Sequence, residues 1–81
     1  MQQKSSALRA KEAFLDLYQA GEFAPGSKLP SEVHMAERLG VSRETWRKAL
    51  SLLRSDGLLV SKHGSGTYLL ERPRRIAKDL S

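Results

Sequence analysis

Apolar side chains recur every three or four positions over residues 7–20. The stripe is formed by Ala10, Ala13, Phe14, Leu17 and Tyr18. This spacing puts them on one face of an amphipathic helix, which Gly21 ends. The next segment, 22–30, contains prolines and a glycine and predicts a turn-rich connection, with Phe23 and Leu29 as apolar anchors.

Two shorter helices are predicted after this connection. Ser31 caps the first, because its hydroxyl accepts a hydrogen bond from a backbone N–H of the first turn. The inward stripe of this helix is Met35, Ala36 and Leu39. Gly40 stops it in the left-handed conformation, and Ser42 caps the next helix, expected over 43–55. Two capped helices separated only by residues 40–42 predict a helix-turn-helix.

The pattern changes after Gly57. Residues 58–63 and 67–70 are rich in β-prone side chains, and a glycine-flanked tip joins them, which predicts a β-hairpin. Three helices followed by a β-hairpin wing predict an α+β, mainly α, winged helix-turn-helix fold over residues 1–70. The segment 71–81 is dominated by arginine, lysine and proline and is expected to be a basic linker.

The helix over 43–55 has two chemically different faces when it is laid out at about 100° per residue. One face is apolar and carries Trp46, Ala49, Leu50 and Leu53. The opposite face carries Arg43, Glu44, Arg47, Lys48, Ser51 and Arg54. A solvated surface helix also has a charged outer face. Four cations against one anion, directly after a tight turn, favour a polyanionic partner.

Composition and charge agree with a small binding domain. The chain has 81 residues, enough for one thin core, and a net charge of +5, with nine of its fourteen lysines and arginines in residues 41–81. The absence of cysteine excludes a disulfide framework, a thiolate zinc site and a cysteine nucleophile. We find neither a signal-peptide h-region nor a membrane-length apolar run, and we expect a cytoplasmic protein without membrane contact.

Side-chain type suggests how the charged face reads bases. Arg43 and Arg47 are candidates for guanine O6 and N7, since a planar guanidinium matches that pair of acceptors. Glu44 either accepts a hydrogen bond from cytosine N4 or repels phosphate and restricts binding.

Other residues are better suited to the DNA backbone. Ser42 and Thr45, in the first turn of helix 43–55, are placed to bind phosphate, and Ser31 is expected to contact DNA from the start of the second helix. Lys48 and Arg54 either contact the DNA backbone or remain solvated.

The hairpin tip is a second candidate contact. It is formed by His63, Gly64, Ser65, Gly66 and Thr67. Its glycines permit a tight turn and a close backbone approach, which entry into a minor groove requires. Such a tip is also typical of an ordinary turn, and its position directly after the helix-turn-helix favours the DNA-binding interpretation.

Other chemistries find less support. His34 and His63 are 29 residues apart and lack metal-ligand spacing, so we expect no metal and no cofactor. Ser42 has no histidine nearby in sequence to act as its base, and we expect no enzyme activity. Trp46 and Tyr68 have rings that stack on bases in some proteins, but both lie at positions expected to pack in the core.

Two functional classes remain open. One is a DNA-binding regulator, and the other is a winged-helix protein–protein interaction module, because fold does not dictate function. A protein-binding version should present apolar anchors on the outer face of helix 43–55, where this chain presents arginines. DNA binding is therefore preferred.

Several separated stretches resemble the DNA-binding domain of GntR-family regulators. They are PGSKLPSE at 25–32, MAERLGVSR at 35–43, TWRKAL at 45–50, Leu53, DGL at 56–58 and GSGTY at 64–68. The resemblance covers about residues 8–70, and several stretches at fixed spacing are more specific than any single motif.

The resemblance implies a bacterial transcription regulator, expected to be a repressor, that binds a palindromic operator as a homodimer. By position, the recognition helix contacts the major groove through Ser42, Arg43, Thr45 and Arg47, and the wing contacts the minor groove through His63 and Gly64. The family joins this domain to a C-terminal effector-binding domain. We therefore expect a truncated chain whose residues 71–81 lead towards that domain, the only place for a small-molecule effector.

Four positions depart from the family pattern. Val33 stands where an arginine is common, Glu44 where a threonine or small polar residue is common, and Ser61 and Ser65 where basic wing residues are frequent. These departures imply a different operator and weaken the expected contact from the second helix.

Overall fold

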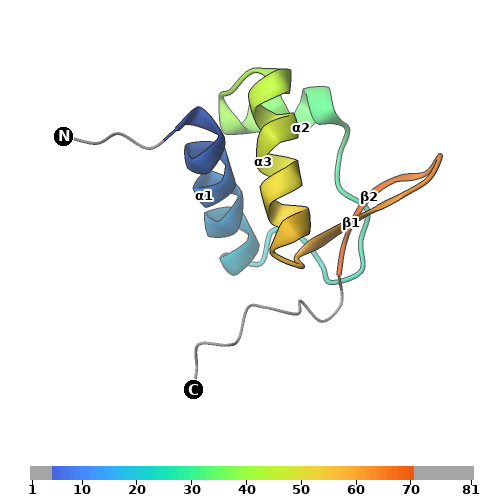
Figure 1. The fold of residues 1–81 in the computed structure, drawn as a ribbon. Coiled ribbons are helices and arrows are strands. Elements are labelled where there is room, and N and C mark those ends of the chain that lie inside the picture. The colour runs from blue at the N-terminus through green and yellow to red at the C-terminus, as the bar shows by residue number, and fades with distance from the viewer. Residues whose placement is uncertain (1–4, 71–81) are drawn as a thin grey trace.

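The computed structural model describes residues 5–70 (Figure 1). Its elements are α1 Ser6–Gln19, α2 Glu32–Leu39, α3 Arg43–Ser55, β1 Leu59–Lys62 and β2 Gly66–Leu69. This order confirms the predicted fold class of three helices followed by a hairpin. Residues 1–4 and 71–81, which include the expected basic linker, lie outside the described residues.

Serine side chains set the start of every helix. The hydroxyls of Ser5, Ser31 and Ser42 each accept a hydrogen bond from the backbone N–H three residues further on, at 3.1, 3.2 and 3.0 Å. The caps at Ser31 and Ser42 confirm the sequence prediction, whereas Ser5 starts α1 one residue earlier than expected. Gly40 ends α2 in the left-handed conformation with φ 73°, as predicted.

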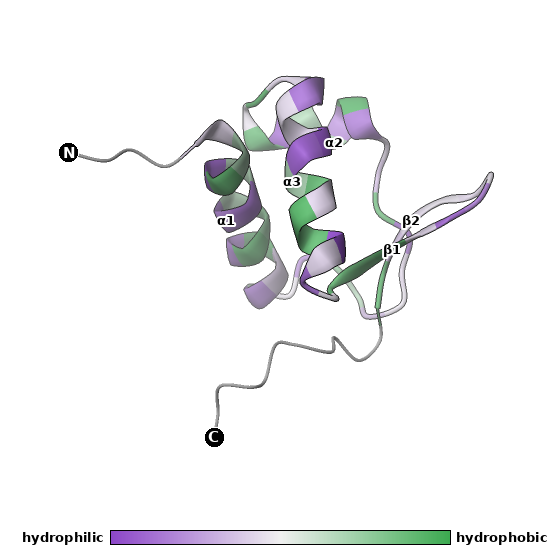
Figure 2. Ribbon diagram, viewed as in Figure 1, coloured by the Kyte–Doolittle hydropathy of each residue, from purple (hydrophilic) through white to green (hydrophobic). Residues whose placement is uncertain are grey.

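The core lies between α3 and the elements that surround it. Figure 2 shows hydrophobic and hydrophilic residues alternating along α1 and α3, as amphipathic helices require. The buried core consists of Ala10, Phe14, Leu29, Met35, Ala36, Trp46, Ala49, Leu50, Leu53, Leu58, Leu59 and Leu69. The predicted inner face of α3 is thus confirmed. On α1, Leu15 also packs against the core, although it lies outside the predicted stripe.

Aromatic rings fill the centre of this core. The ring of Phe14 lies 5.2 Å from that of Phe23 and 5.7 Å from that of Trp46, centroid to centroid. These contacts join α1, the α1–α2 connection and α3. Such rings bury more apolar area than smaller side chains, so their burial contributes strongly to the stability of a small domain.

Part of the α1–α2 connection is extended and joins the hairpin. Leu29 donates its backbone N–H to the carbonyl of Thr67 at 2.8 Å, and Leu69 donates to the carbonyl of Ser27 at 2.9 Å. The prediction of a turn-rich connection was therefore incomplete, because segment 26–29 runs antiparallel beside β2. This pairing holds the base of the hairpin against the body of the domain.

The hairpin projects away from the helices (Figure 1). In the antiparallel β1–β2 pair, Leu59 lies opposite Leu69 at the base and Lys62 lies opposite Gly66 near the tip. Both leucines are buried, whereas residues 61–66 are exposed. The wing is thus fixed at its base and exposed to solvent at its tip.

Among the described residues, no helix has the length and apolar character needed to cross a membrane.

Candidate nucleic-acid interface

The outer face of α3 is open to solvent. All six side chains predicted to point outward are exposed, namely Arg43, Glu44, Arg47, Lys48, Ser51 and Arg54. The side chains of Arg43 and Arg47 are 57% and 58% exposed. Because Trp46, one position before Arg47, is 1% exposed, the helix holds its arginines outward by burying its other face.

A carboxylate from α2 meets both arginines. The Nε of Arg47 donates a hydrogen bond to Oε1 of Glu32 at 2.9 Å. One Nη of Arg43 lies 3.7 Å from the same oxygen. Glu32 is the first residue of α2 and directly follows the cap Ser31, so this ion pair links the two helices of the helix-turn-helix at their exposed face. The sequence pattern does not predict this link.

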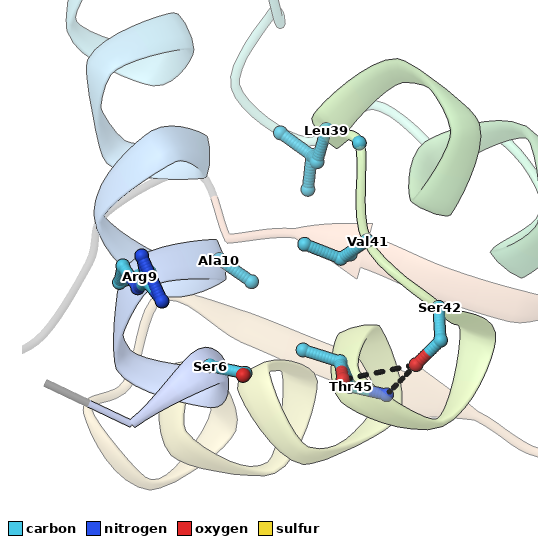
Figure 3. Close-up of a pocket in the computed structure, with 8 residues that line it drawn as sticks. Ser6, Arg9, Ala10, Leu39, Val41, Ser42 and Thr45 are labelled. Carbon is cyan, nitrogen blue, oxygen red and sulfur yellow. Dashed lines mark hydrogen bonds between the residues drawn. The ribbon is translucent and has the colours of Figure 1, made fainter.

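Two hydroxyls lie together at the amino end of α3 (Figure 3). Ser42 Oγ accepts the backbone N–H of Thr45 at 3.0 Å and donates to Thr45 Oγ1 at 2.9 Å. Both residues line a groove of about 520 Å³ that also includes Ser6 and Arg9 of α1. The predicted phosphate ligands therefore share a hollow with an arginine that sequence reasoning had not singled out, at the positive end of the α3 dipole.

Lys48 and Arg54 have different surroundings. Lys48 is exposed, and we find no ion pair to it within residues 5–70. Arg54 donates to Ser61 Oγ at 3.1 Å and to Ser51 Oγ at 3.4 Å. Arg54 therefore ties the end of α3 to β1, and Ser61, which departs from the family pattern, serves as its acceptor.

Tyr68 organises the base of the exposed wing tip. Its hydroxyl lies 2.7 Å from Ser65 Oγ, and the ammonium of Lys62 lies 4.6 Å from the centre of its ring. Tyr68 was expected in the core and is only partly buried. Tyr68 instead supports the wing in two ways: its hydroxyl forms a hydrogen bond with Ser65, and its ring makes a cation–π contact with Lys62.

Lys28 connects the wing to the body of the domain. Gly66 has φ 133°, and a Cβ at this position would lie 2.7 Å from Lys28 Cε. The lysine stem therefore runs directly beside the wing backbone. A groove of about 330 Å³ lies beside it, where the wing, the start of α2 and α3 meet. It is lined by Lys28, Leu29, Pro30, Ser31, Glu32, Trp46, Leu50, Ser65, Gly66 and Thr67.

The structure groups the predicted site residues on three exposed segments. They are Ser31 before α2, then Ser42, Arg43, Glu44, Thr45, Arg47 and Lys48 at the start of α3, and His63, Gly64, Ser65 and Gly66 at the wing tip. All of these residues are exposed except Thr45, which is partly buried. The groove beside Lys28 brings Ser31 together with Ser65 and Gly66. Three neighbouring charged residues, Arg9, Lys28 and Glu32, were missed from the sequence.

The two histidines lie on separate exposed segments, His34 on α2 and His63 on the wing tip. In the described part of the chain, we find no group of three or more His, Cys, Asp or Glu side chains that could hold a metal ion.

Residues 7–69 match the sequence model of the family described as bacterial regulatory proteins, gntR family. The chain belongs to the GntR family. The matched range includes every predicted site residue and all five elements of the fold except the first residue of α1.

Curated relatives of this GntR domain are transcription regulators by name. It is 41% identical over 63 residues to the histidine utilization repressor of Pseudomonas aeruginosa, an alignment that covers 78% of this chain and 25% of that protein. It is 51% identical over 51 residues to the HTH-type transcriptional regulator LutR of Bacillus subtilis, covering 63% of this chain and 23% of LutR. The chain thus spans about a quarter of the length of these relatives.

Solved structures share the fold of this GntR domain. AraR(DBD), crystallised in complex with operator ORX1, superposes with a TM-score of 0.72 at 36% identity, covering 83% of this chain and 81% of that one. A GntR family transcriptional regulator from Listeria monocytogenes superposes with a TM-score of 0.79 at 26% identity, covering 94% and 67%. The chain is therefore a winged helix-turn-helix domain of a transcription regulator, which favours the DNA-binding class over a protein-interaction module.

Proposed function

We propose that this GntR domain binds double-stranded DNA sequence-specifically, with α3 in the major groove and the wing tip, residues 63–67, at the minor groove. The observation that carries the proposal is the outer face of α3, where Arg43 and Arg47 are exposed while Trp46 is fully buried. A helix with this division of faces presents charged side chains to a groove without loosening its attachment to the core.

The long side chains on the outer face of α3 read the bases. Arg43 and Arg47 lie one turn apart and reach guanine O6 and N7 from the same side of α3. Glu44 lies beside them and accepts from cytosine N4 or repels phosphate from wrongly placed DNA. Each well-formed bidentate pair contributes about 1–3 kcal/mol of discrimination against the wrong base.

Phosphates are bound by hydroxyls at the amino end of α3 and by nearby cations. Ser42 and Thr45 present hydroxyls at the amino end of α3, where backbone N–H groups and the helix dipole also favour an anion. Arg9 lines the same groove and adds positive charge beside them. Lys48 contributes a further exposed cation. Such contacts fix the orientation of the protein on the duplex and make binding depend on salt.

The wing is proposed to bind DNA through close approach of its backbone to the minor groove, and not through long side chains. His63, Gly64, Ser65 and Gly66 are all exposed, and the small residues allow the backbone to come near the edge of a minor groove. Ser31 lines the same groove as Ser65 and Gly66, so it is placed to contact the strand that passes between wing and helix.

The whole regulator acts as a repressor of nearby genes, in agreement with the name of the histidine utilization repressor, and pairs as a homodimer on a palindromic operator. Two-fold symmetry of the protein places its half-sites about one helical turn, or a multiple of it, apart. Its small-molecule effector binds a further domain, and it works in the cytoplasm by binding rather than by catalysis.

Selection of bound duplexes from a random pool tests the proposal. We expect one enriched motif with at least one strongly preferred guanine per half-site, and an affinity that falls steeply as salt rises. If no motif is enriched among the bound duplexes, or if binding is insensitive to salt, sequence-specific DNA binding is contradicted. Binding to a protein partner through the outer face of α3 would favour the protein-interaction class.

A further inference from the structure

The contact between Glu32 and Arg47 uses one particular edge of the guanidinium. Glu32 Oε1 accepts from Nε of Arg47 at 2.9 Å. An arginine has five N–H donors in a planar fork, and this contact engages the single donor nearest the stem. The two terminal Nη groups keep their donors and point away from the stem. These are the groups that form a bidentate pair with guanine.

We propose that Glu32 is a positioning residue that sets the base selectivity of the domain by holding Arg47 with its two Nη groups directed at the DNA. The inference rests on the proposed function and assigns a role that neither the sequence motifs nor the exposed face of α3 alone indicates. Glu32 itself need not touch a base.

Glu32 is suited to this role by its own attachment. It is the first residue of α2, directly after the Ser31 cap, whose hydroxyl accepts the N–H of His34 at 3.2 Å. Its backbone is therefore fixed, and its acidic side chain is favoured at a helix amino end. The Glu32 side chain is 39% exposed, against 58% for that of Arg47, so the less exposed partner holds the more exposed one.

The expected effect is on selectivity more than on stability. Exposed ion pairs contribute little to folding stability, because solvent screens the charges. Holding a rotamer-rich arginine in its binding geometry reduces the entropy lost when the base contact forms. The carboxylate also lowers the local positive charge that attracts any phosphate, which weakens binding to DNA of the wrong sequence. Both effects raise the ratio of specific to non-specific affinity.

Arg43 should respond less than Arg47. Its Nη lies 3.7 Å from the same Glu32 oxygen, which is beyond a hydrogen bond. Its guanidinium therefore keeps all its donors and is attracted to Glu32 without being fixed in orientation. Loss of Glu32 should accordingly affect the base pair read by Arg47 more strongly than the pair read by Arg43.

The test compares Glu32→Ala and Glu32→Gln with a matched control, Glu22→Ala. Glu22 pairs with Arg38 at 2.6 Å, both side chains are 41% exposed, and the pair does not involve α3. Affinity is measured for the selected duplex and for duplexes with single base-pair changes, at low and moderate salt. Thermal unfolding shows that each variant is folded.

We expect Glu32→Ala to lose about tenfold of the preference for the guanine read by Arg47, and to bind random duplex severalfold more tightly at low salt. Glu32→Gln keeps an acceptor but loses the charge, and should give an intermediate preference. Glu22→Ala should keep the preference of the wild type. In the NMR spectrum of the free protein, slow exchange of the Arg47 Nε–H should be lost in Glu32→Ala.

A folded Glu32→Ala with the wild-type preference, within about twofold, overturns the inference. An equal loss of preference in Glu22→Ala also overturns it, because the effect then does not come through Arg47. If the wild type itself shows no base preference, the proposed function fails, and this outcome is distinct from failure of the Glu32 role alone.

Discussion

Helix α3 and the wing are both exposed to solvent on the same domain but are built in different ways. The exposed part of α3 carries long charged side chains, held outward by a buried Trp46 and linked to Glu32. The wing tip carries His63 and small residues, and it is held through backbone pairing at its base. Long directed side chains discriminate between bases, whereas small residues on a fixed backbone permit close approach. Base selectivity should therefore reside in α3, and the wing should add affinity.

Helix α3 and the wing depend on the same core. Removing the largest ring of that core, that of Trp46, should therefore abolish the difference between base selectivity in α3 and added affinity from the wing. Trp46 is 1% exposed, and its ring packs on Phe14. We expect Trp46→Ala to cost about 3–5 kcal/mol of unfolding free energy, a large part of the stability of a domain this small. Urea denaturation followed by circular dichroism measures it, with Lys48→Ala as a surface control. A variant of unchanged stability would show that α3 is not held by this ring.

Arg47→Ala should remove selectivity and leave the wing's contribution intact. We expect a loss of about 1–3 kcal/mol of preference for one guanine position, and a smaller change in affinity for random duplex. Competition binding with single base-pair variants measures the preference. Unchanged selectivity would mean that Arg47 does not read a base.

Gly66→Ala should affect the wing and spare base selectivity. Its φ of 133° disfavours any side chain, and Lys28 Cε has to move from the place the new methyl takes. We expect about 1–2 kcal/mol of strain, with weaker binding to all duplexes alike. The double variant Gly66→Ala with Lys28→Ala separates the two causes, because it relieves the crowding and keeps the backbone strain. A changed base preference would contradict the division of roles between wing and helix.

Lys48→Ala should have the smallest effect. The side chain is exposed, and we propose that it contacts a phosphate, so we expect a weakening of a few-fold that is the same for every sequence. The slope of log affinity against log salt should become shallower by about one. A loss confined to one duplex sequence would instead assign Lys48 to a base.

The sequence predicted those features that depend on local chemistry. Ser31 and Ser42 were identified as caps because a cap needs only a hydroxyl before a helical stripe, and Trp46 was placed in the core from its spacing with Leu50 and Leu53. The exposed position of Arg47 followed from the same spacing. These features determine the fold and most of the candidate site.

Contacts between separate elements were not predictable in the same way. The pairing of segment 26–29 with β2 uses backbone groups, which leave no side-chain periodicity in the sequence. The link from Glu32 to Arg47 depends on how α2 and α3 cross and on the rotamers of two long side chains. Such an exposed pair adds little to stability, so no strong pattern marks it.

The structure of the domain bound to its selected duplex is the most direct test of base reading by α3. We expect the two Nη groups of Arg47 to lie about 2.7–3.2 Å from O6 and N7 of a guanine in the major groove, with Glu32 still bound to Nε. Arg47 bound only to phosphate, or α3 lying outside the groove, would contradict this expectation.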